Sequence, residues 1–185
     1  KFVNKIPVKK HDHVLIPAGT VHCSGADTMV LEISATPYIF TFKLWDWGRV
    51  DLDGKPRPIH LEHGAANIQW YRNTEWVHRN LVNAVAEVYT GENGTVVRTG
   101  LHEREFLDTF RFTTSSALPV HRNGSVHMLN LVDGTRAVLR SKSDAFPPLE
   151  LHYAETCIVP QAAGDYEIYS PDGSEVKVIL ACVRN

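Results

Sequence analysis

A histidine that follows a tight turn is the first candidate for chemistry in this chain. The segment IPAGTVH (16–22) places Pro17, which fixes one backbone angle, and Gly19, which permits a tight turn, shortly before His22. A metal-binding histidine must be held rigidly with its lone pair pointing inward, and such a turn would bring His22 to the inner rim of a β-barrel. Taken alone, however, the pattern is more typical of a structural or solvent-exposed histidine.

Two other histidine pairs are candidates for the same role. His11 and His13 are alternate residues that could share a strand face and supply ligands, but their segment is basic and has an exposed composition. His121 and His127 flank an Asn-Gly turn in a later series of strands, close to where the first histidines of a second metal site would be expected. Because no glutamate follows them at a suitable spacing, we predict that this later series binds no metal.

These residues must be positioned mainly by β-structure, because short apolar runs separated by Gly, Pro, Asn and Asp dominate the chain. The runs recur about every ten residues, which is typical of an antiparallel sandwich or barrel. Helical signal is weak and confined to the middle of the chain. We therefore predict an all-β fold, a jelly-roll or β-sandwich with few short helices. The predicted strands are VLIP (14–17), MVLEIS (29–34), IFTFKLW (39–45), TVVRT (95–99), SVHMLNLV (125–132), RAVLR (136–140) and EVKVILACV (175–183).

The strands fall into two series. We expect residues 1–63 to form the first, 64–85 a connection with room for short helices, and 86–185 a smaller β domain. The first series has too few strands to bury both faces of a sheet. Either it packs on the second series, or its missing strands lie before Lys1. The tryptophans are expected where the two series meet, or else as the floor of a sugar site: Trp45, Trp47, Trp70 and Trp76.

Composition excludes several classes of partner. The 185 residues carry a formal net charge of −2, so we expect binding neither to nucleic acid nor to an anionic membrane. The chain has neither an apolar run of about 18 residues nor a signal-peptide pattern. Three scattered cysteines, Cys23, Cys157 and Cys182, do not suit a disulfide framework and fit reduced thiols. We therefore expect a cytoplasmic protein.

A longer stretch of sequence resembles a known family. The strings IPAGTVHCSG, MVLEIS and FKLWDWGRVDLDGKPRPIHLE, within residues 14–63, resemble the second half of the catalytic cupin of type I mannose-6-phosphate isomerases. Residues 86–185 are consistent with the smaller C-terminal cupin-like domain of that family. Within them, ETCIVPQAAGDYEI (155–168) repeats the strand–Pro–turn layout of the first segment, and Tyr166 lies nearest the ligand position.

The resemblance implies a site that this chain holds only in part. His22 occupies the place of a zinc ligand, whereas the segments that carry the family's other ligands are absent from the chain. Lys43 stands where the family has a catalytic arginine, and Ile39 where it has an aspartate. A lysine there could still face a phosphate, but without a bidentate fork. Arg49 is a candidate for phosphate contact, or a structural arginine paired with a neighbouring aspartate.

The implied activity is the isomerisation of mannose 6-phosphate to fructose 6-phosphate through a zinc-assisted enediol. Because one histidine cannot hold zinc with useful affinity, we expect no stoichiometric zinc and no activity from this chain by itself. One alternative is a non-catalytic sugar-binding or regulatory cupin domain. Another is an interaction domain that forms a homodimer through an exposed strand of the unfinished first sheet. The sequence upstream of Lys1 would discriminate the enzyme from the binding domain.

Overall fold

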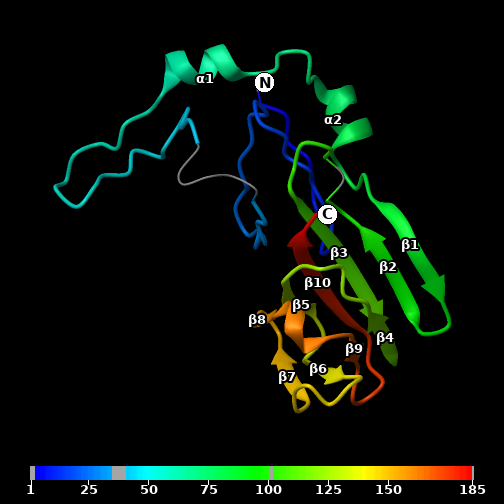
Figure 1. The fold of residues 1–185 in the computed structure, drawn as a ribbon. Coiled ribbons are helices and arrows are strands. Elements are labelled where there is room, and N and C mark those ends of the chain that lie inside the picture. Colours follow the sequence, from blue (N-terminus) through cyan, green and yellow to red (C-terminus); the bar gives the residue numbers. More distant parts are fainter. Residues whose placement is uncertain (1–2, 35–40, 101, 185) are drawn as a thin grey trace. The chain divides into compact units, whose positions relative to one another are not determined.

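A computed structural model describes residues 3–34, 41–100 and 102–184 and divides the chain into two compact units. Unit 1 is Lys1–Val82 and unit 2 is Asn83–Asn185 (Figure 1). Unit 1 contains two short helices, and the strands lie in unit 2. In chain order the elements are α1 (Leu61–Asn67), α2 (Thr74–Asn80), β1 (Ala86–Gly91), β2 (Gly94–Arg98), β3 (Leu107–Thr114), β4 (Ala117–Val120), β5 (His127–Asp133), β6 (Arg136–Ser141), β7 (Leu149–His152), β8 (Thr156–Val159), the 3-10 turn η1 (Gln161–Ala163), β9 (Tyr166–Tyr169) and β10 (Val176–Val183).

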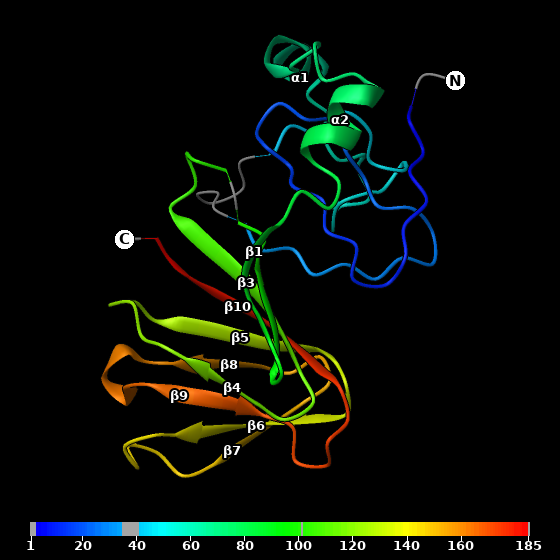
Figure 2. The ribbon, with the colours of Figure 1, turned by 90° about the vertical axis from the view of Figure 1, so that its right-hand side faces the viewer.

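Unit 2 is a two-sheet antiparallel sandwich, as predicted. One sheet has the order β1-β2-β3-β10-β5-β8 and the other β4-β9-β6-β7. Figure 2 shows the two sheets as separate layers, with β5 and β8 in one and β9, β6 and β7 in the other. The predicted strands within 95–99, 125–132, 136–140 and 175–183 correspond to β2, β5, β6 and β10. The all-β prediction with few short helices is confirmed.

Alternation of side chains explains how the sandwich forms its core. Leu180 on β10 lies opposite Leu129 on β5, and both point inward because successive strand residues face opposite sides. Leu139 and Ile168 pair across β6 and β9 in the facing sheet. Each of these four side chains is at most 2% exposed. Two inner faces of this kind, packed together, supply the main stabilisation of unit 2.

Unit 1 differs from the prediction. The segments 14–17, 29–34 and 41–45 contain no regular strand ladder, and residues 39–40 of the third predicted strand lie outside the described residues, as does Ile39 itself. The pairing described here consists of two isolated bridges, Val14 with Val82 and Val50 with Pro56. A strand needs a neighbouring strand to complete its hydrogen bonds, and the described part of unit 1 offers none.

The two helices of unit 1 are short but have identifiable local causes. In α2 the Asn73 side chain caps the N-terminus by accepting a hydrogen bond from the Trp76 backbone N–H at 3.0 Å. In α1, Gly64 is buried where the helix passes close to Leu44, and a Cβ at position 64 would lie 2.3 Å from Leu44 Cδ2. Gly64 therefore permits a close approach here rather than breaking the helix.

Candidate functional site

The IPAGT segment forms a tight turn of defined geometry. The Thr20 backbone N–H donates to the Pro17 carbonyl at 3.2 Å, which closes a four-residue turn. Gly19 is its third residue and has φ +80°, the value that a type II turn requires at that position. A Cβ at Gly19 would lie 2.5 Å from the Asn67 carbonyl oxygen, so both conformation and space demand glycine.

The turn presents the imidazole of His22 to solvent. His22 is exposed, and its Nδ1 lies 2.9 Å from the Thr20 carbonyl oxygen. A carbonyl oxygen can only accept a hydrogen bond, so Nδ1 must carry the proton in this arrangement. The neutral ring then has its lone pair on Nε2, the nitrogen that points away from the turn. Tying one ring nitrogen to a carbonyl in this way is how proteins set the metal-binding nitrogen of a histidine.

His22 does not belong to a complete metal site among the described residues. Within residues 3–34, 41–100 and 102–184, no group of three or more His, Cys, Asp or Glu side chains could hold a metal ion. His11 and His13 therefore do not complete a site with His22. Zinc needs three or more protein ligands, so the described residues fit one corner of a zinc site and do not fit a whole one.

A segment distant in sequence supports the turn. Arg72 Nη1 donates to the Pro17 carbonyl at 3.1 Å, to the Ala18 carbonyl at 2.8 Å and to Thr20 Oγ1 at 2.5 Å. The Gln69 backbone N–H donates to the Gly19 carbonyl at 3.0 Å. Sequence reasoning missed Arg72, because nothing in its local pattern links it to a turn more than fifty residues upstream.

Lys43, the first predicted catalytic residue, belongs to a cluster around Asp46. Lys43 Nζ lies 3.4 Å from Asp46 Oδ1, and Arg57 grips the same carboxylate with Nε at 2.6 Å and Nη2 at 3.0 Å. Burial alone would raise the pKa of Asp46, but the hydrogen bonds from Arg57 and Lys43 outweigh it and lower the pKa. The cluster leaves a net positive charge, which suits an anionic ligand.

Arg49, the second predicted catalytic residue, is exposed. The structural alternative for Arg49 was an ion pair with Asp46 or Asp51. The Asp46 carboxylate pairs with Arg57, and the Asp51 carboxylate accepts hydrogen bonds from backbone N–H groups. Arg49 contacts this region through its backbone: its N–H donates to the Asp46 carbonyl, and its carbonyl accepts from the Arg57 N–H. Residues 46–57 thus form a narrow arm whose base is the Asp46–Arg57 ion pair.

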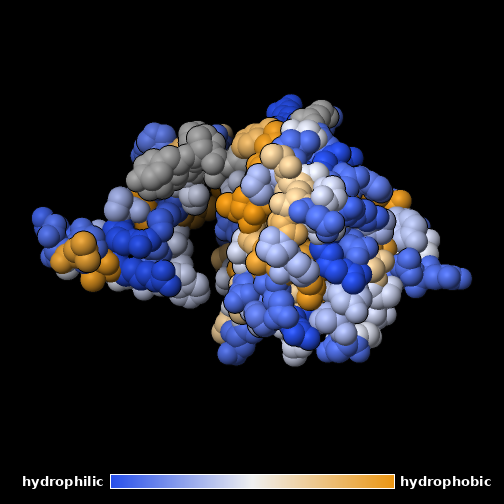
Figure 3. Space-filling model, turned by 60° about the horizontal axis from the view of Figure 1, so that its bottom comes forward, coloured by the Kyte–Doolittle hydropathy of each residue, from blue (hydrophilic) through white to orange (hydrophobic). Residues whose placement is uncertain are grey.

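The tip of this arm is a turn built around Asp51. Its carboxylate accepts hydrogen bonds from the backbone N–H groups of Asp53 and Lys55, each at 2.9 Å. Val50 and Leu52 on the arm are exposed, and Figure 3 shows hydrophobic colour among hydrophilic residues on the projecting arm. The arm therefore combines a fixed backbone with apolar side chains left in solvent.

His60 connects the Asp46 cluster to a pocket. The Lys43 N–H donates to His60 Nδ1 at 3.2 Å, and the His60 N–H donates to the Lys43 carbonyl at 2.7 Å. Residues 59–63 line an open pocket of about 420 Å³ on the surface. The backbone of Lys43 pairs with His60, which lines this pocket, whereas its ammonium group lies beside Asp46.

The four tryptophans that were expected between the two strand series or at a sugar site differ in exposure. Trp45, Trp47 and Trp70 are exposed, each by more than half of its surface. Trp76 is half-buried and meets the Tyr71 ring edge-on, with 5.5 Å between the ring centroids. Neither the seam nor the sugar floor is decided by these exposures, and both stay predictions.

In unit 2, His121 and His127 lie in different environments. His121 is exposed and pairs with Asp165 at 2.9 Å, whereas His127 is buried inside the sandwich. His127 Nδ1 accepts from the Tyr166 hydroxyl at 2.9 Å, and its Nε2–H donates to Asn123 Oδ1 at 3.2 Å. Burial, followed by the nearby positive charge of Arg122, lowers the pKa of His127 to about 4. Both ring nitrogens are occupied, so His127 has a structural environment.

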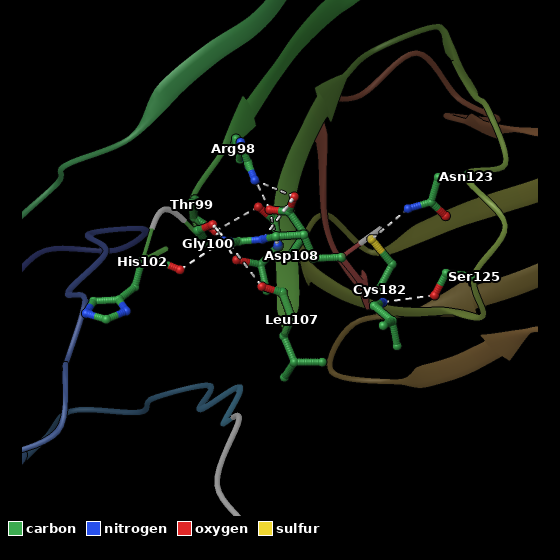
Figure 4. A network of polar contacts seen from close by, with 12 residues as sticks. Arg98, Thr99, Gly100, His102, Leu107, Asp108, Asn123, Ser125 and Cys182 are labelled. Atoms are coloured by element: carbon green, nitrogen blue, oxygen red, sulfur yellow. Dashed lines mark hydrogen bonds and ion pairs between the residues drawn. The ribbon is translucent and has the colours of Figure 1, made fainter. Parts of the chain in front are cut away.

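Other polar contacts anchor the end of β10 and the loop after β2. Arg98 holds Asp108 through two contacts, Nε to Oδ1 at 2.8 Å and Nη2 to Oδ2 at 2.7 Å (Figure 4). Asn123 Nδ2 lies 3.4 Å from Cys182 Sγ, and burial raises the pKa of that thiol. Arg184 donates to the carbonyls of residues 100, 102 and 107. The network ties loops to strands, as Figure 4 shows for Arg98, Asp108, Asn123 and Cys182.

Comparisons with known proteins agree with the resemblance. No protein-family model matches the chain. Over 61 residues it is 37% identical to mannose-6-phosphate isomerase of Streptococcus mutans, an alignment that covers 33% of this chain and 19% of that protein. Over 69 residues it is 34% identical to mannose-6-phosphate isomerase ManA of Bacillus subtilis, covering 37% and 22% respectively.

The fold points to the same proteins. The crystal structure of the mannose 6-phosphate isomerase from Bacillus subtilis superposes with a TM-score of 0.54 at 13% identity, covering 76% of this chain and 39% of that one. About a third of this chain is thus similar in sequence to part of two mannose-6-phosphate isomerases. The fold of this chain is similar to part of that crystal structure. The chain spans about a fifth of the length of the curated mannose-6-phosphate isomerases it matches. Among the described residues, neither helix is long and apolar enough to cross a membrane.

Proposed function

We propose that this chain forms part of a mannose-6-phosphate isomerase-like enzyme that interconverts an aldose and a ketose phosphosugar. The observation that carries the proposal is His22, presented by a type II turn with Nδ1 bonded to a carbonyl and Nε2 open. That arrangement is what a metal-ligating histidine needs. The partial match to proteins named mannose-6-phosphate isomerase supplies the reaction class.

The remaining strands of the catalytic barrel would come from chain outside these 185 residues. The exposed apolar side chains of unit 1 support this part of the proposal, because Met29, Val30 and Leu31 are all more than half exposed. Contiguous apolar surface of this kind normally faces a partner. Strands pairing with residues 14–17 and 29–34 would cover it and would bring further ligands to His22.

The positive residues of unit 1 would bind the sugar phosphate. We propose that Lys43 and Arg49 contact the phosphate or the negative charge that develops during isomerisation. Arg57 and Lys43 both contact the Asp46 carboxylate, so the three side chains form one cluster that carries a net positive charge. A zinc ion at a completed site would polarise the oxygens of the sugar while a proton moves between C1 and C2. A cytoplasmic location fits such an enzyme.

A direct test uses the polypeptide that contains this chain together with the proposed remaining strands. We expect conversion of mannose 6-phosphate to fructose 6-phosphate that a chelator abolishes and zinc restores. His22→Ala should remove both the activity and the bound zinc, whereas His121→Ala, a change at an exposed histidine of unit 2, should leave both intact. Chelator-resistant activity, or full zinc content in His22→Ala, would contradict the proposal.

A second candidate function is a non-catalytic sugar-binding or regulatory domain. It is favoured by the missing ligand group, because the described residues offer no set of three or more His, Cys, Asp or Glu side chains that could hold a metal ion. Calorimetry of this chain with mannose 6-phosphate distinguishes the two functions when it is combined with the assay above. Binding by this chain, together with an inactive longer polypeptide, would support the regulatory function.

A homodimer is a further proposal for the state of this chain. Strand β1 is the edge of its sheet, and all six of its residues are exposed, including Val88 and Tyr89. An unpaired edge can add a strand from a second copy. Light scattering would then give twice the mass of the chain, and Val88→Lys should restore the monomer. A monomeric wild-type chain would contradict this proposal.

A further inference from the structure

The loop before β5 contains the pair Asn123–Gly124, whose chemistry the proposed function does not use. An asparagine followed by glycine can close a five-membered imide, because glycine has no Cβ to hinder its backbone nitrogen as it approaches the side-chain carbon of the asparagine. Both residues are exposed, so water reaches them. Within the part of the chain that the structure describes, the Gly124 N–H donates to no other group. Its nitrogen is therefore not restrained by a hydrogen bond.

The side-chain amide of Asn123 is held between two groups of the sandwich. Its Oδ1 accepts the Nε2–H of His127 at 3.2 Å, and its Nδ2 lies 3.4 Å from Cys182 Sγ (Figure 4). When a nitrogen adds to an amide carbon, negative charge develops on the amide oxygen, and a donor already placed at that oxygen stabilises it. The His127 N–H therefore lies where imide formation would need a donor.

The direction of the hydrogen bond from His127 is set by the residues behind it. Arg122 donates to the hydroxyl oxygen of Tyr166, because a guanidinium can only donate. The Tyr166 proton is then directed to Nδ1 of His127, 2.9 Å away. Since Nδ1 accepts, the neutral ring carries its proton on Nε2, toward Asn123. Tyr166 and His127 are at most 2% exposed, so water does not replace either partner.

We propose that Asn123–Gly124 is a modification site at which the chain forms an imide with itself, assisted by the His127 N–H at Asn123 Oδ1. The Gly124 nitrogen bonds to Asn123 Cγ, the bond from Cγ to Nδ2 breaks, and the amide proton of Gly124 leaves with Nδ2 as ammonia. Water then opens the imide. Opening at Cγ gives aspartate at position 123, and opening at the backbone carbonyl gives an isoaspartate linkage.

The modification would change a charge beside the buried histidine. The aspartate product places a carboxylate against Nε2 of His127, and an opposite charge at this distance favours the protonated ring. The pKa of His127, about 4 in the unmodified chain, should therefore rise. The site thus couples the age of the chain to the protonation of the sandwich interior.

A second Asn-Gly pair, Asn93–Gly94, is an internal comparison. Asn93 is also exposed, so access to water does not distinguish the two pairs. Its Oδ1 meets the neutral Ser116 hydroxyl at 3.4 Å, a longer contact than the one from His127. Gly94 belongs to β2 and pairs with Gly91 on β1. The sequence alone predicts equal reaction at the two pairs, whereas the structure predicts faster reaction at residue 123.

The test follows both pairs in one sample of this chain kept folded near neutral pH. Peptide mass spectrometry over time detects loss of ammonia and then gain of water at each pair. We expect reaction at residue 123 to be faster than at residue 93 by about 10-fold or more, a small part of what one such donor contributes in an enzyme. In urea, where the fold is lost, the two rates should become similar.

Variants identify the assisting group. His127→Phe removes the donor and keeps a ring, so it should slow the reaction at Asn123 to about the rate at Asn93. Tyr166→Phe leaves Nδ1 of His127 without its donor and should slow the reaction at Asn123 by a smaller factor. His121→Ala is the matched control, because His121 is exposed and pairs with Asp165, and it should change neither rate.

The amide NMR signals of β5 and β10 show whether each variant keeps the sandwich. If His127→Phe does not fold, Tyr166→Phe and the comparison of the two pairs in the folded chain carry the test. Equal rates at both pairs in the folded wild type would overturn the inference. It would also be overturned by an unchanged ratio of the two rates in every folded variant at positions 127 and 166.

Discussion

The two units contain similar apolar runs but organise them in different ways. In unit 2 each run pairs with at least one neighbour, and Leu129 and Leu131 reach 0% exposure. In unit 1 a comparable run, 29–34, leaves Met29 79% exposed. The helices and turns of unit 1 are held instead by side-chain hydrogen bonds and ion pairs. The difference shows that a β-type sequence supplies the capacity to pair, whereas the neighbouring strand decides whether a sheet forms.

The largest expected contrast between the units comes from matched truncations. Leu129→Ala should lower the free energy of unfolding of unit 2 by about 2–5 kcal/mol, because it opens a cavity in a closed core. Leu31→Ala makes the same change in unit 1, where the side chain is about half exposed, and should cost about 0.5 kcal/mol or less. Urea denaturation followed by the fluorescence and circular dichroism of each variant measures both. Equal losses would contradict the contrast.

The next effect is a pH dependence confined to unit 2. The unfolded chain protonates a histidine near pH 6.5, whereas folded His127 has a pKa of about 4. Between these values the unfolded state binds more protons, so the stability of unit 2 should fall by about 2 kcal/mol as the pH drops from about 6.5 to about 4, and this contribution should then level off.

The control for this effect replaces the titrating ring. His127→Gln should remove that part of the pH dependence, while the exposed change His121→Ala should keep it. Chemical denaturation at a series of pH values gives the two curves. A parallel dependence in wild type and His127→Gln would show that other groups cause it.

A smaller effect tests whether local contacts hold unit 1. Asn73→Ala removes the side-chain cap of α2 and should reduce the stability of that helix by about 1 kcal/mol. Hydrogen exchange of the α2 amides measures the change. His60→Ala is the comparison, because His60 occupies the equivalent position of α1 without a capping hydrogen bond from its side chain to that helix. Equal effects on the two helices would weaken the account of unit 1 as locally stabilised.

The smallest expected effect concerns one carboxylate. In Arg57→Ala the pKa of Asp46 should rise, because its principal hydrogen-bond donor is lost while its burial remains. Arg49→Ala should leave that pKa unchanged, since Asp46 pairs with Arg57. Carbon-13 NMR titration of the aspartate carboxyls measures both variants. If the pKa of Asp46 rose in Arg49→Ala and not in Arg57→Ala, the ion pair would have been attributed to the wrong arginine.

The sequence was sufficient to predict the sandwich of unit 2, because alternation and turn residues are local signals. Runs such as 175–183 alternate clearly and became β10, whereas 29–34 carries the same signal without a ladder. Pairing depends on a second segment, and a local pattern cannot report whether that segment is present. The helices at 61–67 and 74–80 fall within the stretch where short helices were expected.

The candidate site was predicted less completely than the fold. The turn at 17–20 follows from Pro17 and Gly19, both of which act within the turn, whereas His22 is exposed to solvent and not at the inner rim of a barrel as predicted. Arg72 and Arg57 were missed because their contacts join residues far apart along the chain. The roles of Lys43 and Arg49 in catalysis stay predictions, and so does the division at residues 63 and 85.

Two glycines of unit 1, Gly64 and Gly19, differ in how well they tolerate substitution. A methyl group at Gly64 would meet the end of a leucine side chain, which can rotate away or be exchanged for a smaller residue. A methyl group at Gly19 would meet the carbonyl of Asn67, which is main chain and cannot be mutated. We therefore expect substitutions at position 64 to occur together with substitutions at position 44 in related sequences. Position 19 should stay glycine. Glycine is therefore required at position 19 and replaceable at position 64.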